Sequence, residues 1–595
     1  MPTGAGKSIC YQIPALLMDG LSLVISPLIS LMKDQVNALQ EAGIPCAFLN
    51  SSLSYPEYKE TLQGALSGVY KILYIAPERL ASEGIYNIAH NTRISMVVVD
   101  EAHCVSQWGH DFRPSYLKIK EFIDNLNYKP VIGAFTATAT KNVQQDIKSM
   151  LELKNPYEIV TGFDRTNLYY EVQRLESAAE KNKAVFTYIQ NNPNKSGIIY
   201  CSKRKTVEEV CDILNSAGVP TTRYHAGLAD EERHANQDDF IYDRKTVMVA
   251  TNAFGMGIDK SNVSFVIHYN MPKNIESYYQ EAGRAGRDGE NADCILFYSA
   301  QDVHTNKYLI EHSENSAGIE DIDRSLADKL KKQNLELLKF MTFYSTTQYC
   351  LRSYILNYFG EKTNALCGHC SNCLTQFEET DITIEAKKIV SCVYRVEQRG
   401  NEKHGPIYFG KTMIIDILHG SKNNKVLEAG LNTLSTYGIM ADNGTNRIRR
   451  ILDYLIENDY LAISANEYPV VMRTEKSADV FKTDFSIIIK LPKAEKQTSA
   501  RMDFYKEQNE DLNIDLSLFE KLKALRTKLA SDAKIPAYIV FADASIKDMC
   551  IKKPVTKESF LNVSGVGKRK QEQYAEVFIA EIKAHLRQSA EATVG

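Results

Sequence analysis

Short apolar runs alternate with amphipathic helical patterns along residues 1–300 of the chain. The runs are rich in β-branched residues and nearly uninterrupted, which is typical of central strands in a parallel sheet, because these are buried on both faces. Strands and helices that alternate in this way predict a doubly wound α/β fold. The polar stretch 153–167 interrupts the pattern, so we expect two such sheets. The predicted strands are 21–27, 71–77, 94–100, 131–137, 196–202, 245–251 and 264–270.

From about residue 311 the pattern becomes helical and charged. Residues 384–460 predict several helices, and the β-like YPVVMRT (468–474) follows them, a combination that indicates a winged-helix unit. Polar residues dominate 490–511, which we interpret as a linker, and 512–588 predict a last helical domain. The chain has 595 residues. A single core stops growing near ~250–300 residues, so several domains are expected.

Composition and charge narrow the class of protein. Hydrophobic residues make up 44% of the chain and charged residues 24%, as in ordinary globular proteins. No apolar run approaches the ~20 residues that cross a membrane, and no signal-peptide pattern opens the chain. We therefore expect a cytoplasmic protein with no membrane partner. The net charge of −4 does not favour nucleic-acid binding overall, so any such binding must come from local sites.

The stretch TGAGKS (3–8) near the start has the pattern of a nucleotide phosphate loop. Glycines let backbone N–H groups approach phosphate oxygens closely. Lys7 is expected to reach the β- and γ-phosphates, and Ser8 to hold Mg²⁺. Met1 stands where the pattern G-x-x-x-x-G-K-[ST] has its first glycine, and a glycine-rich turn without a ligand is the alternative interpretation. The predicted nucleotide-binding residues here are Thr3, Gly4, Ala5, Gly6, Lys7 and Ser8.

The stretch VVVDEAHC (97–104) places two carboxylates at the end of a predicted strand. Asp100 is expected to hold Mg²⁺, and Glu101 to orient or deprotonate the attacking water. An acidic loop without a catalytic role is the alternative, and the phosphate loop earlier in the chain argues against it.

The second predicted sheet ends in YYQEAGRAGRDG (278–289), with Arg284 and Arg287 among glycines. A guanidinium is always charged and binds phosphate oxygens with two N–H groups. An arginine supplied from a second domain can act as an arginine finger. Gly257 and Asp259 are expected to complete a polar edge of the same cleft. A solvated loop is the alternative.

Four cysteines, Cys350, Cys367, Cys370 and Cys373, follow the pattern C-x₁₆-C-x₂-C-x₂-C. This spacing suits tetrahedral Zn²⁺, and in a cytosolic chain it indicates metal binding rather than disulfides. Four protein ligands leave no position for a substrate, so the predicted role is structural. His369 lies inside the cluster and is interpreted as a spacer.

PTGAGKS, DEAH, AFTATAT, ATNAFGMGID and QEAGRAGRDG follow one another in this order, and together they resemble a superfamily-two DExH helicase. More narrowly, the chain resembles the RecQ family of DNA helicases over essentially its whole length. HCVSQWGHDFRPSYLKI (103–119) resembles the aromatic-rich loop that couples DNA binding to ATP hydrolysis in that family, and it holds the only Trp of the chain. Aromatic faces stack on unpaired bases at ~1–3 kcal/mol each. The DNA-binding residues expected in this loop are Gln107, Trp108, Phe112 and Arg113.

The resemblance implies an ATP-dependent DNA helicase of 3′-to-5′ polarity that acts in recombination and repair. It implies ATP, Mg²⁺ and Zn²⁺ as ligands, and DNA, both single-stranded and forked duplex, as partner, with single-strand-binding protein and other repair proteins. If the chain is bacterial, association with the nucleoid is expected. His103 and Gln280 would link the nucleotide to DNA-contacting elements, and Arg287 is our choice as the finger.

The resemblance also divides the chain into domains. We expect two RecA-like domains (1–161 and 162–310), a helical zinc-binding module (311–378), a winged-helix RQC domain (379–492), a linker (493–511) and a small all-helical HRDC domain (512–590). Tyr538, Ile539, Val540 and Phe541 are predicted core residues of the last domain. Basic residues expected to contact DNA phosphates are Lys422, Lys425 and Arg447 in the winged helix, and Lys568, Arg569 and Lys570 in the HRDC domain.

Members of the family begin a few dozen residues earlier, with the strand that precedes the phosphate loop and a glutamine motif that reads adenine. We therefore expect a wrongly assigned start codon or a fragment, and an in-frame stop codon just upstream would contradict the first of these. A chain that truly starts at Met1 is expected to bind nucleotide weakly. Two other functions consequently stay open: a DNA-binding protein without helicase activity, and another DExH nucleic-acid translocase.

Overall fold

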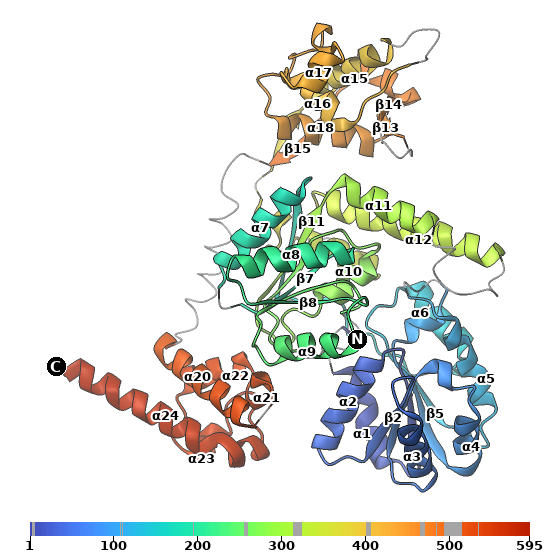
Figure 1. Ribbon diagram of the computed structural model, residues 1–595, viewed down its shortest axis with the longest axis vertical. Helices are drawn as coiled ribbons and strands as arrows, with labels where there is room; N and C mark the ends of the chain where they lie inside the picture. The colour runs from blue at the N-terminus through green and yellow to red at the C-terminus, as the bar shows by residue number, and fades with distance from the viewer. Residues whose placement is uncertain are drawn as a thin grey trace. The chain divides into compact units, whose positions relative to one another are not determined.

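The computed structural model describes the chain in two compact units, residues 1–374 with 497–595 and residues 375–496. Figure 1 shows the helices and strands of both units. In the described part, no helix is long and apolar enough to cross a membrane. The description covers all residues except 3–5, 108, 110, 194, 255–259, 313–323, 364, 376, 400–405, 465–469, 484, 493–514, 534 and 595.

The first RecA-like domain is built on a parallel sheet in the order β2-β3-β1-β4-β5. Four of the predicted strand runs contain β1, β3, β4 and β5. β2 was not predicted, because its sequence CAFL contains none of the β-branched residues that mark the other runs. The strands are β1 (Leu21–Ile25), β2 (Cys46–Leu49), β3 (Ile72–Ile75), β4 (Ile94–Val99) and β5 (Val131–Ala134). The helices are α1 (Lys7–Leu17), α2 (Ile29–Glu41), α3 (Tyr55–Leu66), α4 (Glu83–Asn91), α5 (Lys118–Asp124) and α6 (Lys141–Met150).

Strand side chains alternate between the two faces of this sheet, and each face has its own helical cover. Leu23 and Val97 belong to the core that α3, α4, α5 and α6 cover. Val24 and Val98 belong to the core that α1 and α2 cover. Because both faces of the sheet are covered, β1, β3 and β4 are almost fully buried and nearly apolar, and this is the pattern from which the sheet was predicted; the edge strand β5 is half-buried, with Val131 exposed.

The second RecA-like domain has a six-stranded parallel sheet in the order β6-β11-β10-β7-β9-β8. The predicted runs contain β7, β9 and β10, whereas the sequence pattern missed β6, β8 and β11. The strands are β6 (Leu168–Arg174), β7 (Gly197–Tyr200), β8 (Thr221–Tyr224), β9 (Val247–Ala250), β10 (Phe265–His268) and β11 (Ala292–Tyr298). The helices are α7 (Ala178–Gln190), α8 (Arg204–Ser216), α9 (Asp230–Ile241), α10 (Ile275–Ala282) and α11 (Ala300–Glu311).

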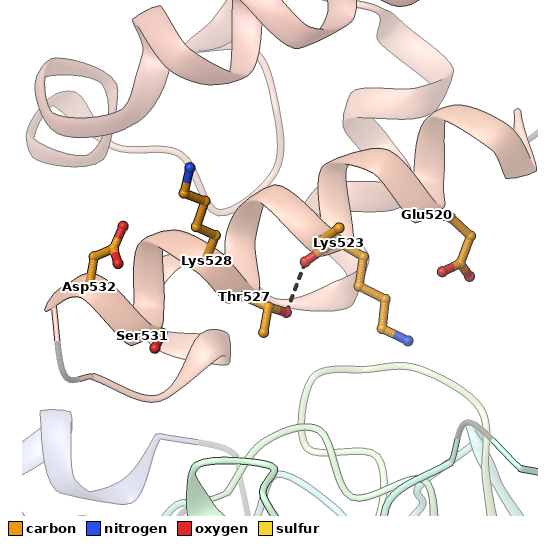
Figure 2. A pocket seen from close by; sticks show the side chains of 7 residues that line it. Glu520, Lys523, Thr527, Lys528, Ser531 and Asp532 are labelled. Atoms are coloured by element: carbon orange, nitrogen blue, oxygen red, sulfur yellow. Dashed lines mark hydrogen bonds between the residues drawn. The ribbon is translucent and has the colours of Figure 1, made fainter.

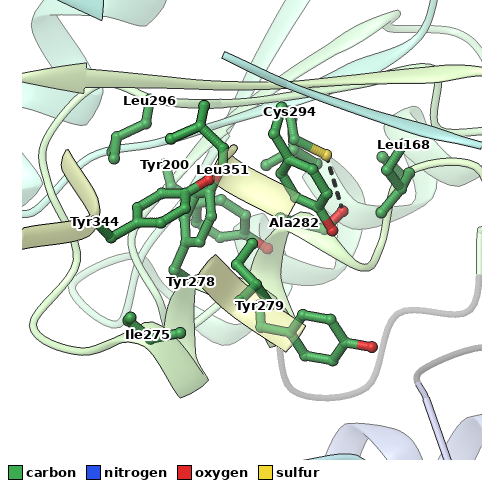
Figure 3. Close-up of a cluster of buried hydrophobic side chains, with 14 of the residues drawn as sticks. Leu168, Tyr200, Ile275, Tyr278, Tyr279, Ala282, Cys294, Leu296, Tyr344 and Leu351 are labelled. Atoms are coloured by element: carbon green, nitrogen blue, oxygen red, sulfur yellow. Dashed lines mark hydrogen bonds between the residues drawn. The ribbon is translucent and has the colours of Figure 1, made fainter. Parts of the chain in front are cut away.

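The zinc-binding module shares its core with this second sheet. Its helices are α12 (Arg324–Thr346), α13 (Leu351–Tyr358) and α14 (Ser371–Leu374). Tyr344 and Leu351 of the module pack with Tyr278 of α10 and Leu296 of β11, as Figure 3 shows. α7 and α8 cover the opposite face of the sheet. The module therefore forms part of the helical cover of one face of the second domain, together with α9, α10 and α11.

The second unit has one apolar core, formed mainly by α15 (Thr383–Glu397), α16 (Lys411–His419) and α18 (Thr445–Glu457). The short α17 (Asn424–Glu428) also contributes to it. β13 (Leu461–Ile463) pairs with β14 (Val471–Arg473), and this hairpin forms the wing; β14 lies within the predicted β-like stretch, whereas β13 was not predicted. β12 (Phe377–Asp381) pairs with β15 (Ile488–Pro492). Residues 490–492 thus belong to a strand, consistent with the winged-helix bounds 379–492; the interpretation of 490–511 as a linker is wrong for these three residues because their backbone pairs with β12.

The last domain consists, in its described part, of α20 (Leu516–Ala533), α21 (Ala537–Val540), α22 (Asp543–Lys552), α23 (Lys557–Phe560) and α24 (Lys568–Val594). Val540 and Phe541 are buried in its core, as predicted. Ile539 is 41% exposed and Tyr538 is half-buried, so their placement in the core was wrong. Successive side chains of one helical turn point in different directions, and one short run cannot be buried throughout.

Candidate functional site

The two acidic residues predicted to serve catalysis stand at the end of β4. The backbone N–H of Asp100 donates to Ile25 O at 2.9 Å, which extends the pairing of β4 with β1 by one residue. The Tyr116 hydroxyl donates to Asp100 O at 2.9 Å. Glu101 has a φ of 46°, a left-handed conformation that costs a non-glycine residue energy. The chain therefore turns sharply after the strand, and Asp100 and Glu101 are held at the sheet's carboxyl edge.

The phosphate-loop residues that the structure describes lie near the same carboxyl edge of the sheet. Gly6, with φ of 78°, precedes α1, which starts at Lys7. Burial raises the pKa of Tyr11, the charge of Asp100 raises it further and the Ser8 side chain lowers it, so Ser8 and Asp100 both lie near the Tyr11 hydroxyl. Tyr11 is buried, and sequence reasoning had not singled it out. Thr3, Gly4 and Ala5 lie outside the described residues.

The electrostatics of this site centre on Asp100. Burial, followed by the charge of the Glu101 carboxylate, raises the pKa of Asp100 to about 6, even though the Lys7 ammonium lowers it. Lys7, Asp100 and Glu101 are therefore close enough to interact. Two adjacent carboxylates in a buried place beside one ammonium form a site whose charge balance favours a cation.

His103 contacts both Glu101 of the acidic pair and Thr136 of the motif AFTATAT (134–140). Its Nδ1 lies 2.9 Å from Thr136 Oγ1 and 3.3 Å from Glu101 Oε2. Burial lowers the pKa of His103, but the contacts with Cys104 and Glu101 more than offset burial and raise it. Thr136 belongs to AFTATAT (134–140), which the sequence analysis noted only as a motif. A contact across 33 positions leaves no local signal that could have named Thr136.

Two of the DNA-binding residues predicted in the aromatic-rich loop, Phe112 and Arg113, are half-buried. Arg113 donates through Nε and Nη2 to Asp111 Oδ2, at 3.1 and 3.0 Å, and through Nη1 to Pro27 O at 3.1 Å. Much of its donor capacity is therefore used within the protein. Gln107 is also half-buried, and Trp108 lies outside the described residues.

The second domain presents its arginines directly after α10, in residues 283–287, here called the arginine loop. Arg284 is buried and lies beside Tyr200. Burial raises the pKa of Tyr200 to about 12, even though the charge of the Arg284 guanidinium lowers it. Arg287 and Gln280 are half-buried. Gly257 and Asp259 lie outside the described residues.

The four predicted metal ligands form one cluster. The Sγ atoms of Cys350, Cys367, Cys370 and Cys373 all lie within 4.8 Å of one another, and those of Cys367 and Cys373 are 3.8 Å apart. Tetrahedral Zn²⁺ with Zn–S bonds of about 2.3 Å separates its sulfurs by about 3.8 Å, so the donor set fits. The His369 ring packs against Tyr169, with ring centroids 5.4 Å apart, and its role as a spacer stays a prediction.

The basic residues predicted to contact DNA in the C-terminal domains differ in their surroundings. Lys422, Lys425, Lys568 and Arg569 are exposed. Arg447 Nη2 pairs with Glu385 Oε1 at 2.9 Å, and the Lys570 ammonium lies 5.3 Å from the Phe541 ring centroid. A pocket along α20 is lined by two lysines and two acidic residues, among others (Figure 2). Its balanced charge gives it no preference for a phosphate backbone.

Comparison with known proteins assigns these domains. A DEAD/DEAH box helicase model matches residues 1–146, and a helicase conserved C-terminal domain matches 180–289. RecQ zinc-binding matches 300–374, the RQC domain 376–498 and the HRDC domain 515–582. The ATP-dependent DNA helicase RecQ of Bacillus subtilis is 43% identical over 587 residues, which cover 99% of this chain and 93% of that protein. The chain belongs to the RecQ family of ATP-dependent DNA helicases.

Two further RecQ helicases are similar over nearly the whole chain. That of Pasteurella multocida is 37% identical over 98% of this chain and 88% of its own length, and that of Haemophilus influenzae is 37% identical over 98% and 90%. The predicted family, fold class and enzyme class are thus confirmed, as are ATP and zinc as ligands. The individual site residues and the domain boundaries stay predictions.

Proposed function

We propose that this RecQ-family chain unwinds duplex and forked DNA in the 3′-to-5′ direction, with ATP bound between its two RecA-like domains. The observation that carries the proposal is the grouping of Lys7, Ser8, Asp100 and Glu101 at one sheet edge. In this mechanism Lys7 binds the β- and γ-phosphates, and Glu101 orients or deprotonates the attacking water. His103, held by Thr136, and Gln280 transmit the state of the nucleotide to the DNA-contacting elements.

Mg²⁺ is the ion that this site would hold, with Ser8 and Asp100 as its protein ligands. A hydroxyl and a carboxylate are hard oxygen donors, which suit Mg²⁺. When bound, the ion neutralises charge on the phosphate oxygens. Lys7 contributes a fixed positive charge to the same phosphates, and Glu101 stays available for the water.

Arg284 and Arg287 act from the second domain, with Arg287 as the finger. A guanidinium placed on the γ-phosphate stabilises the negative charge of the transition state. Closure of the two domains on ATP would bring these arginines to the nucleotide, and hydrolysis would release them. Each cycle would advance single-stranded DNA across both domains while the winged helix holds the duplex. Recombination and repair, in the cytoplasm and on the nucleoid of a bacterium, with single-strand-binding protein as a partner, fit this activity.

Two assays test the proposal. We expect ATP hydrolysis by the chain to rise strongly on addition of single-stranded DNA, and a duplex with a 3′ tail to be unwound. A duplex of the same sequence with a 5′ tail is the matched control and should stay paired. Equal unwinding of both substrates would contradict the polarity. Binding of forked DNA without DNA-stimulated turnover would favour the rival function, a DNA-binding protein without helicase activity.

The acidity of Asp100 leads to a pH-dependent prediction. A carboxyl group binds Mg²⁺ only when ionised, and the pKa of Asp100 is about 6. Its ionised fraction falls about tenfold from pH 7 to pH 5. The Mg²⁺ concentration that half-saturates binding of a fluorescent ATP analogue should therefore rise about tenfold over this range. The charge of Glu101 contributes to the raised pKa, so the rise should be smaller in Glu101→Gln. Titration of the nucleotide itself affects the parent protein and Glu101→Gln equally. An identical pH dependence of Mg²⁺ binding in the parent and in Glu101→Gln would contradict the prediction.

A further inference from the structure

The backbone of the arginine loop is held by an arginine from a distant part of the sequence. Arg165 Nη1 donates to Gly283 O at 3.2 Å, and its Nη2 donates to Ala285 O at 2.9 Å and to Gly286 O at 2.8 Å. One guanidinium thus binds three carbonyls of a loop only five residues long. Charged donors make hydrogen bonds about twice as strong as neutral ones, and the planar group fixes the geometry.

Asn167, two positions after Arg165, holds the same loop. Its Nδ2 donates to Gly286 O at 2.9 Å and to Glu290 O at 2.7 Å, and the Ala292 N–H donates to Asn167 O at 3.0 Å. Gly286 has a φ of 57°, and a Cβ atom there would lie 2.5 Å from Asn167 Nδ2. A side chain at this position would therefore push Asn167 and the loop apart.

The segment that carries Arg165 and Asn167 is itself fixed by the zinc-binding module. Arg352, two positions after the metal ligand Cys350, is buried. Its Nη1 donates to Asp164 Oδ1 and to Arg165 O, both at 2.8 Å. Its Nη2 donates to Leu168 O at 2.7 Å and to Thr166 O at 3.2 Å. Figure 3 shows that α10, which leads into the arginine loop, packs against Tyr344 and Leu351 of the same module.

We propose that Arg165, anchored by Arg352 of the zinc-binding module, is a positioning residue that sets the arginine loop for ATP hydrolysis. The inference rests on the proposed role of Arg287 as the finger. A catalytic group displaced by about 1 Å can lose about 10²-fold in rate, so a loop with a finger needs fixed backbone geometry. Arg165 does not need to touch ATP, because it acts through the carbonyl before Arg284 and the two carbonyls between Arg284 and Arg287.

The test uses the full chain and separates positioning from folding. We expect Arg165→Ala to lower kcat for DNA-stimulated ATP hydrolysis by about 10–100-fold, with KM for ATP and affinity for single-stranded DNA within about twofold of the parent values. Arg165→Lys keeps the charge but lacks the planar group, and should recover part of kcat. Arg174→Lys is the matched control, because Arg174 Nη2 also binds a backbone carbonyl, Thr346 O at 3.1 Å, yet not one in the arginine loop. That control should keep its kcat.

A double-mutant cycle with Arg287→Ala decides the inference. If Arg165 acts through the loop, Arg165→Ala adds little to the loss in Arg287→Ala, since the two act as a unit. Losses that multiply, or a normal kcat in Arg165→Ala, would overturn the inference. A normal kcat in Arg287→Ala alone would instead overturn the proposed finger. If Arg165→Ala does not fold, Asn167→Ala removes two bonds to the same region, and a normal kcat there would also overturn the inference.

Discussion

Glutamine in place of Glu101 is expected to abolish ATP turnover while leaving ATP binding intact. The substitution keeps the size and shape of the side chain and removes the carboxylate that serves as the base. General-base catalysis contributes typically about 10²–10⁴-fold, and kcat for DNA-stimulated hydrolysis should fall by that factor. Lys7 and Ser8 are untouched, so nucleotide affinity should persist. Asp100 should become more acidic, since the charge of Glu101 raises its pKa.

Glu121→Gln provides the matched control. Glu121 is an exposed residue of α5 in the same domain, and its replacement makes the same change of charge. Its kcat should equal that of the parent protein. Duplex unwinding at the parental rate by Glu101→Gln would contradict the role assigned to Glu101. Lost ATP binding, measured with a fluorescent analogue, would indicate that Glu101 supports the site's structure instead.

Local patterns in the sequence predicted the parts of this protein that local physics determines. All seven apolar runs contain strands, and six of these strands are almost fully buried, which requires a nearly uninterrupted apolar sequence; only β5 is half-buried. The four cysteines could be grouped because three of them lie within seven positions, and a metal site imposes that spacing. Strand β6 was missed because its outer half, with Glu171 and Gln173, is polar and half-buried.

Contacts between distant residues could not be predicted in the same way. Arg165 reaches carbonyls 118 to 121 positions away, and Arg352 reaches Asp164 across 188 positions. Backbone carbonyls carry no side-chain identity, so nothing in the sequence marks them as partners. Arg447 was predicted as a phosphate contact, but the sequence did not indicate its pairing with Glu385. The tertiary fold decides which cationic side chains pair with acidic groups of the protein itself.

Loss of one zinc ligand is the second large effect that we expect, because the metal site supports more than its own module. Metal binding to such sites supplies about 10–16 kcal/mol of folding free energy, as much as the whole stability of a typical domain. Cys370 is fully buried, and its backbone bridges to Tyr170 of β6. Cys370→Ser should therefore release zinc and loosen the cover that the module forms over the second sheet.

The consequence for catalysis follows from the shared core. α12 and α13 contribute Tyr344 and Leu351 to the core that also holds α10, and α13 carries Arg352. Unfolding of the module would free the segment that holds Arg165 and, with it, the arginine loop. We expect Cys370→Ser to lower the melting temperature of the second domain, to expose it to protease and to reduce kcat at least as much as Arg165→Ala does.

Cys294→Ser is the control that distinguishes the loss of the metal from the effect of placing a hydroxyl group in this core. Cys294 lies in the same core, where its Sγ donates to Ala282 O at 3.6 Å, and it is not one of the four clustered thiols. It should keep its zinc and lose about 0.5–3 kcal/mol of stability, as single buried substitutions usually do. Zinc content measured by atomic absorption, together with calorimetry, compares the two variants. If Cys370→Ser lost its zinc but kept the parental melting temperature and kcat, the metal would not support the second domain, and the arginine loop would have to be held by Arg352 and the apolar core alone.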